Sequence, residues 1–227
     1  MLELDYSNSA TVFESHKNNV PAGIEADAKY LNPDLPIEER VEDLIGRMTP
    51  DEKASQMLND APAIERLGIP RYEWWSEALH GIARAGKATV FPQAINLGAT
   101  FDPELIHRVA SAISDEGRAK HHAAANAGNR GRSRGLTFWS PTVNLIRDPR
   151  WGRGHESYGE DPYHLGVMGT AFVRGMQGDD ARGKPLGKFM KVGACAKHYA
   201  VHSGPEGKRH NFNAIASKKD MQETYLP

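Results

Sequence analysis

The stretch LTFWSPTVNLIRDPRWGRGHESYGEDP, residues 136–162, holds the clearest unit of structure in this sequence of 227 residues. Its first part, Leu136 to Leu145, has the character of a short buried strand. A loop rich in glycine, arginine and carboxylates follows it, and Asp161-Pro162 then opens a helix with apolar residues at helical spacing. The order of strand, loop and helix is typical of parallel βα units.

The same pattern continues on both sides of this unit. Thr89 to Gly98 and Val192 to Val201 also have the character of buried strands, Asp102-Pro103-Glu104 opens another helix, and Ser217 to Asp220 begins a further one. The sequence thus indicates roughly four or five βα units, whereas a closed (β/α)₈ barrel needs eight and about 250 residues. An unclosed parallel sheet would leave an unpaired edge. We therefore expect an α/β fold that is the N-terminal portion of a (β/α)₈ TIM-type barrel, truncated before closure.

The beginning of the chain differs from the rest. Residues 1–32 are polar and aperiodic, and we expect an N-terminal arm or linker there, followed by a partial barrel domain over residues 33–227. Apolar residues at helical spacing predict a helix from Ile37 to Met48. Thr49-Pro50-Asp51-Glu52 predicts a second helix that begins with a capping box.

Composition excludes several classes of partner and site. The chain has 28 lysine and arginine residues against 29 aspartate and glutamate residues, so its charge favours neither nucleic acid nor an anionic membrane as a partner. Cys195 is the single cysteine, which excludes an intramolecular disulfide. Without a basic, apolar N-terminal segment, the chain as written is expected to be cytoplasmic, or periplasmic or secreted if its N-terminus was trimmed.

The loop Asp148 to Pro162 is the first candidate for a functional site. It follows a strand at the carboxyl end, where parallel α/β folds place their binding groups. Arginines and a tryptophan between glycines suit a rigid loop that holds a sugar by bidentate hydrogen bonds and ring stacking. The alternative is a purely structural loop in which Arg150 and Arg153 pair with Asp148 and Glu156.

Two further groups of residues invite attention. Ala196 to Tyr199 lies near the end of the next predicted strand, where Lys197 and His198 can both be functional only if the strand has ended or bulged. A surface lysine beside a packed histidine is the alternative. Tyr72 to Gly81 contains two tryptophans beside Glu77, a combination suited to a pyranose site. Here the alternative is a core strand whose tryptophans fill volume.

Several motifs, taken together, resemble the N-terminal barrel domain of family 3 glycoside hydrolases. They occur in the family's order from about residue 33 to the end. The motifs are Arg47-Met48-Thr49 with Glu52-Lys53, Ser76-Glu77-Ala78-Leu79-His80-Gly81, Phe91-Pro92-Gln93, Asp148-Pro149-Arg150-Trp151-Gly152-Arg153, Tyr158-Gly159-Glu160-Asp161-Pro162 and Ala196-Lys197-His198-Tyr199. The form Glu77 to Gly81, with His202-Ser203-Gly204-Pro205 after the Lys-His pair, is similar to the β-xylosidase-like branch, which also includes β-glucosidases and α-L-arabinofuranosidases.

The resemblance implies a role for each matching residue. Glu77 would bind a distal hydroxyl of the sugar in the minus-one subsite. Arg153, Lys197, His198 and Arg209 would hydrogen-bond the other hydroxyls. Arg150 would support the loop. These are the expected substrate-binding residues, and the expected substrate is an oligosaccharide or β-glycoside.

The resemblance also implies a retaining mechanism, with an aspartate nucleophile and a separate acid/base group. Both would lie beyond the end of this chain, so we expect no catalytic residue in it and assign Asp220 to capping a helix. The expected function is a retaining, exo-acting β-glycosidase of β-xylosidase or β-glucosidase type, with this chain carrying the sugar-binding half of the site. The alternative is a catalytically inactive truncated product, or a sugar-binding remnant that needs a complementing C-terminal chain.

A metal site or a phosphate site is less favoured. His198 and His202 are four residues apart, but zinc ligands at that spacing belong on a helix, and no His-Glu-x-x-His motif occurs. The arginines within Gly128 to Gly135 lack the pattern of a Walker lysine, so a solvated loop is expected there. We therefore expect neither metal nor cofactor.

Overall fold

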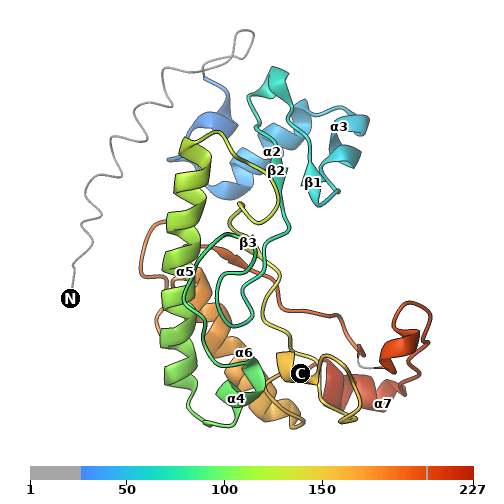
Figure 1. The fold of residues 1–227 in the computed structure, drawn as a ribbon. Coiled ribbons are helices and arrows are strands. Elements are labelled where there is room, and N and C mark those ends of the chain that lie inside the picture. The colour runs from blue at the N-terminus through green and yellow to red at the C-terminus, as the bar shows by residue number, and fades with distance from the viewer. Residues whose placement is uncertain (1–26, 203) are drawn as a thin grey trace, which may run out of the picture. The chain divides into compact units, whose positions relative to one another are not determined.

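The computed structural model describes residues 27–202 and 204–227, which fall into two compact units that meet in sequence at Tyr72 and Glu73 (Figure 1). Its α-helices are α2 (Ile37–Arg47), α3 (Pro50–Ser55), α4 (Ala94–Gly98), α5 (Pro103–Asn126), α6 (Pro162–Gln177) and α7 (Lys218–Asp220). Its strands are β1 (Asp60–Ala61), β2 (Tyr72–Glu73), β3 (Thr137–Phe138) and β4 (Gly193–Ala194). Short 3-10 helices lie at Lys29–Leu31, Glu65–Leu67, Gly154–Glu156 and Glu206–Lys208, and a π-helix at Met221–Tyr225.

Tyr30 organises the first unit. Its ring is buried, its hydroxyl donates to the carbonyl of Leu67 at 2.8 Å, and its backbone N–H donates to Asp43 of α2 at 3.1 Å. The last residues of the expected arm, residues 27–32, therefore include one that packs into this unit. Residues 1–26 of that arm lie outside the described residues.

The helix starts expected from the sequence are confirmed. Thr49 caps α3 by accepting from the N–H of Glu52, whose carboxylate accepts in return from the N–H of Thr49. Asp102 and Asp161 cap α5 and α6, and each carboxylate accepts a hydrogen bond from the backbone N–H three residues further on. Asp220 accepts from the N–H of Ser217 at the start of α7, as expected for a capping residue.

Helices α5 and α6 lie side by side and form most of the core of the second unit (Figure 1). Ile106 and Ile113 of α5, and Phe172 and Met176 of α6, are completely buried. The two helices come close together at Gly175, where an added Cβ would lie 2.4 Å from the carbonyl oxygen of His107. Glycine is therefore required at this contact by the spacing of the helices.

A parallel arrangement of short extended segments faces these helices. β3 pairs with β4 in parallel, with Phe138 opposite Ala194, and Ser76 forms a parallel bridge to Phe138 from the other side. α5 lies between Ser76 and β3 in sequence, and α6 lies between β3 and β4. These three segments and two helices form a βαβαβ arrangement of the kind that the sequence predicted, but its first segment is at Ser76 and not at the predicted strand Thr89 to Gly98.

The predicted strand Thr89 to Gly98 is wrong, and the other two predicted strands are wrong in extent. Residues 94–98 of the predicted strand Thr89 to Gly98 form α4 instead. Pro92 cannot donate to a ladder, and the buried residues Ala94 and Leu97 are three apart, as on a helix face. The other two predicted strands pair regularly over only two residues each, because Pro141 interrupts one of them and the rest forms isolated bridges. The described residues are α/β, but they form no closed barrel.

Membrane crossing is a separate question. Within the described part of the chain, none of the helices combines the length and the apolar character that a transmembrane span requires.

Substitution of Gly175 tests the α5–α6 contact. Alanine normally stabilises a helix interior relative to glycine by about 1 kcal/mol, but Gly175→Ala is expected to destabilise the protein by about 1–3 kcal/mol because the new methyl group overlaps the backbone of α5. Gly166→Ala in the same helix is the matched control. No heavy atom lies within 4 Å of its added Cβ, so it should stabilise. Urea denaturation of both variants measures the difference, and equal effects would contradict the assigned contact.

Candidate functional site

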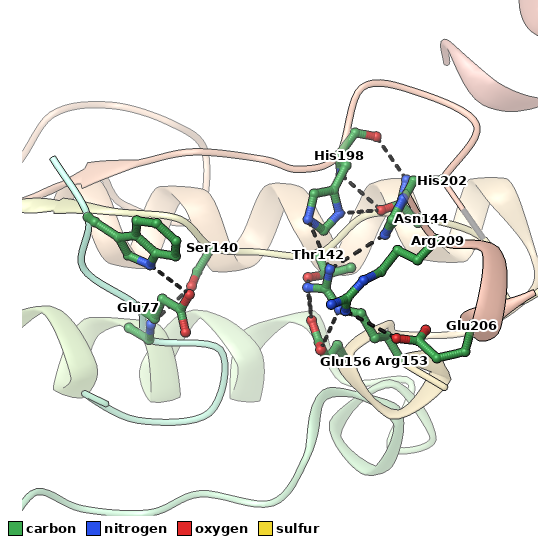
Figure 2. Close-up of polar contacts among 12 residues, drawn as sticks. Glu77, Ser140, Thr142, Asn144, Arg153, Glu156, His198, His202, Glu206 and Arg209 are labelled. Carbon is green, nitrogen blue, oxygen red and sulfur yellow. Dashed lines mark hydrogen bonds and ion pairs between the residues drawn. The ribbon is translucent and has the colours of Figure 1, made fainter. Parts of the chain in front are cut away.

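The candidate site lies where the parallel segments end. Thr142 is completely buried and bridges in parallel to both Ser157 and Lys197, which brings the loop after β3 beside the segment after β4. Figure 2 shows Arg153, Glu156, His198 and His202 gathered around this point. The carboxyl ends of parallel segments therefore carry these polar side chains, as predicted.

Arg153 and Glu156 form the central ion pair. Arg153 Nε donates to Glu156 at 2.7 Å and Nη2 donates at 2.5 Å, in a bidentate arrangement. Burial alone would raise the pKa of Glu156, but the hydrogen bonds and charge of Arg153 and the charge of Lys197 lower it overall. Glu156 also accepts from the Thr142 hydroxyl at 3.3 Å. The carboxylate therefore stays ionised and fixes the guanidinium in place.

His198 lies against this arginine. Its Nε2 is 3.3 Å from Arg153 Nη1, and its Nδ1 is 2.9 Å from the side-chain oxygen of Asn144 (Figure 2). Burial, followed by the positive charge of Arg153, lowers the pKa of His198 to about 4. The imidazole is therefore neutral near pH 7. His202 is the next ring, with its centroid 4.3 Å from that of His198, and burial and Arg153 lower its pKa as well.

Lys197 is half-buried beside the same groups. Burial lowers its pKa, while the charges of Glu77 and Glu156 act to raise it. None of the described residues accepts a hydrogen bond from its ammonium group or forms an ion pair with it. The regular strand β4 has ended at Ala194, so Lys197 and His198 lie past it, which was the condition for both to serve the site.

Glu77 stands to one side of this cluster, next to Ser140 (Figure 2). One of its oxygens accepts from Trp75 Nε1 at 3.0 Å, and Trp75 stacks on Trp139 with ring centroids 4.6 Å apart. Arg132 lies over the Trp75 ring at 4.5 Å. The tryptophan therefore orients the carboxylate, and it is only partly buried, so it does not simply fill the core.

Arg209 lies at the exposed rim. It pairs with Glu206 at 3.1 Å and lines a small hollow with Trp151 and His202. Its positive charge is near enough to His202 to lower the pKa of that ring. The structure thus places Arg209 on the open side of the cluster.

The structure brings together most of the predicted residues. Arg153, Lys197 and His198 adjoin one another, Glu77 lies within electrostatic reach of Arg153 and Lys197, and Arg209 is at the rim. The ion pairs of the alternative interpretation also exist. Arg150 pairs with Asp148 on the surface, holding the pKa of that carboxyl at about 2, so this pair supports the loop.

Asn144 was missed by the sequence analysis. It is a single amide among apolar residues in the sequence. The one feature that could have indicated a role is that a buried polar side chain requires hydrogen-bond partners.

Metal binding has no support from the geometry. Within residues 27–202 and 204–227, no three histidine, cysteine, aspartate or glutamate side chains are grouped so that they could hold a metal ion. The Nε2 atoms of His198 and His202 lie 3.3 and 3.5 Å from Arg153 Nη1, so a permanent cation already lies against both ring nitrogens.

The second unit is a parallel α/β unit, and cations, carboxylates and a neutral imidazole lie at its strand ends. This arrangement is typical of proteins that bind polar ligands at that edge. The chain belongs to glycoside hydrolase family 3, because the model described as "Glycosyl hydrolase family 3 N terminal domain" matches residues 44–227.

Relatives of known name agree with this assignment. The chain is 50% identical over 202 residues to a xylan 1,4-beta-xylosidase of Xylanibacter ruminicola, a match covering 87% of this chain and 23% of that protein. It is 45% identical to a probable beta-D-xylosidase 7 of Arabidopsis thaliana, covering 88% of this chain and 27% of that protein. The chain therefore spans about a quarter of the length of these relatives.

Solved structures give the same result. A GH3 exo-beta-xylosidase (XlnD) in complex with a xylobiose aziridine activity-based probe superposes with a TM-score of 0.72 at 29% identity, over 86% of this chain and 25% of that one. The GH3 beta-glucosidase of Bifidobacterium adolescentis gives 0.64 at 29% identity, over 81% of this chain and 24% of that one. The fold of the described residues is thus that of the corresponding part of these enzymes.

The titration of His198 tests the electrostatics of the site. Its ring should lose its proton at about pH 4, below the usual value of about 6.5. Because the unfolded chain binds this proton at the higher pH, the contribution of His198 to stability falls as the pH drops from about 6.5 to 4. NMR titration of the imidazole measures the midpoint.

Arg153→Gln is expected to raise that midpoint, since it removes the largest of the positive charges acting on the ring. Arg150→Gln, on the surface, is the control and should leave it unchanged. A midpoint that did not move in Arg153→Gln would contradict the assignment.

Proposed function

We propose that this chain carries the hydroxyl-binding part of a retaining, exo-acting β-glycosidase, of β-xylosidase or β-glucosidase type, that hydrolyses terminal non-reducing sugars of oligosaccharides. Membership of the family and the names of the relatives support this proposal. In it, Glu77, Arg153, Lys197, His198 and Arg209 are the substrate-binding residues, and the second unit is part of a (β/α)₈ barrel.

The ammonium of Lys197 is the observation that carries the proposal. A half-buried ammonium has three N–H donors and loses part of its hydration, yet none of the described side chains accepts from it. Neighbouring carboxylates act on it only through their charge. A sugar, whose hydroxyls can accept these hydrogen bonds, would satisfy it.

The carboxylates of the cluster already have partners. Glu156 is held by Arg153, Glu77 accepts from Trp75, and Glu206 pairs with Arg209. A retaining glycosidase needs two carboxyl groups about 5–5.5 Å apart, one of them free to attack the sugar. We propose that the nucleophile and the acid/base group are supplied from outside these 227 residues, in the longer polypeptide or by a complementing chain. The rival is a catalytically inactive product that binds sugar alone.

Binding and turnover of the purified chain test this proposal. D-xylose or D-glucose should bind, as followed by calorimetry, and Glu77→Ala and Lys197→Met should each weaken binding roughly tenfold by removing a charged hydrogen-bond partner. Glu42→Ala and Lys53→Met, exposed on α2 and α3, are the matched controls. Equal affinities in all four variants would refute the assigned site.

Hydrolysis of nitrophenyl β-D-xyloside and β-D-glucoside by the same preparation is expected to be negligible. Loss of a nucleophile costs many powers of ten in rate. Turnover that disappears in Glu77→Ala would show that both catalytic carboxyl groups lie within the chain and would overturn the proposed division of the site.

A further inference from the structure

Asn144 is a buried amide whose orientation is fixed by two carbonyl groups. Only 3% of the residue is exposed. Its Nδ2 donates to the carbonyl oxygen of His198 at 2.8 Å and to that of Ala200 at 3.1 Å. A carbonyl oxygen only accepts, so the amide nitrogen must be the atom that faces both. The amide oxygen Oδ1 therefore points at His198.

That oxygen determines where His198 carries its proton. Oδ1 accepts from the backbone N–H of His198 at 2.9 Å and lies 2.9 Å from its Nδ1. Since Oδ1 has no proton to give, Nδ1 must be the protonated nitrogen. In a neutral ring Nε2 then carries a lone pair, and it faces the permanent donor Arg153 Nη1 at 3.3 Å. Both neighbours thus require the same tautomer.

We propose that Asn144 is a positioning residue that holds His198 as the neutral Nδ1–H tautomer, so that Nε2 accepts a hydrogen bond from a sugar hydroxyl. The second half rests on the proposed function, whereas the tautomer does not. Arg153 shares its Nη1 between His198 and His202, while its Nε and Nη2 make the two hydrogen bonds to Glu156. A hydroxyl can therefore replace Arg153 at Nε2 without freeing the guanidinium.

The surroundings of the ring oppose any other state. The groups acting on it are Arg153, His202, Lys197 and Glu156, of which only Glu156 favours a proton. A second proton would place an N–H at Nε2 against the guanidinium. His198 is thus an acceptor toward the ligand, while Lys197 and Arg153 are donors.

The ring nitrogens of the whole chain, labelled with ¹⁵N at histidine, test the tautomer near pH 7. His198 is assigned by the loss of its signals in His198→Gln. The same spectrum contains references for both tautomers: Nδ1 faces a carbonyl oxygen in His80 and His121, and Nε2 does so in His107 and His164. His198 is expected to match the first pair. A match to the second pair would overturn the proposal.

Two substitutions test the part played by Asn144. Asn144→Ala removes the contact at 2.9 Å and leaves only the longer one to Arg153 at 3.3 Å, so the share of the Nδ1–H tautomer of His198 should fall while the reference histidines stay unchanged. Asn144→Asp places a carboxylate against Nδ1–H, so the pattern should persist and the titration midpoint of His198 should rise by about 1 unit or more. Circular dichroism checks that each variant folds. If Asn144→Ala does not fold, the role of Asn144 is tested by comparing the titration midpoint of His198 in Asn144→Asp with that in the unchanged chain. An unaltered pattern in a folded Asn144→Ala, or an unmoved midpoint in Asn144→Asp, would refute the role.

Addition of D-xylose separates this inference from the proposed function. Binding should shift the Nε2 resonance of His198 more than the Nδ1 resonance. Xylose binding that is weakened in Glu77→Ala but leaves Nε2 unmoved would overturn the acceptor role alone. No binding at all would overturn the proposed function and the acceptor role together, while the tautomer would be judged by the sugar-free spectrum.

Discussion

Backbone pairing at Phe138 is the constraint on which the site depends. Trp139 N–H donates to the carbonyl of Ser76 at 2.8 Å on one side, and Cys195 N–H donates to the carbonyl of Phe138 at 2.9 Å on the other. Three segments separated in sequence by long helices are thereby held in parallel and in register. Since a shift of one residue turns every side chain to the opposite face, this register decides that Glu77 and Lys197 serve the same edge.

The side chains of the cluster at that edge are held by hydrogen bonds within the chain. Arg153 donates two hydrogen bonds to Glu156, three residues further along the chain. Asn144 makes four contacts with the segment that carries His198. A side chain that is already ordered loses less entropy on binding. Arg153 and His198 are already held by these hydrogen bonds, so a ligand that binds to them loses less of its binding free energy to the ordering of side chains.

The sequence predicted the helices better than the strands, for a local reason. An Asp-Pro or Thr-Pro pair acts within one turn of chain, so the starts of α3, α5 and α6 could be located to the residue. A strand is defined by partners distant in sequence. The apolar residues that end at Gly98 are compatible with a buried strand as well as with helix α4. The three-residue spacing of the buried side chains is what distinguishes the helix from the strand.

The site shows the same division. Charged residues after predicted strands could be assigned to one edge, because parallel strands share it. Asn144 could not be assigned, because its function depends on carbonyl groups more than fifty residues away in sequence. A single amide between Val143 and Leu145 carries no mark of those partners.

The pattern of donors and acceptors constrains which ligand the edge can hold. Lys197 and Arg153 only donate hydrogen bonds, whereas Glu77 and the lone pair on Nε2 of His198 only accept. A phosphate or a carboxylate could satisfy the first two groups but would face the lone pairs of the others, and an ammonium ligand would have the opposite conflict. A hydroxyl group both donates and accepts, so a ring bearing several neutral hydroxyls can satisfy both kinds of group at once. The mixed lining is therefore consistent with the proposed sugar ligand and not with an ion of either sign, and this holds only while His198 remains uncharged.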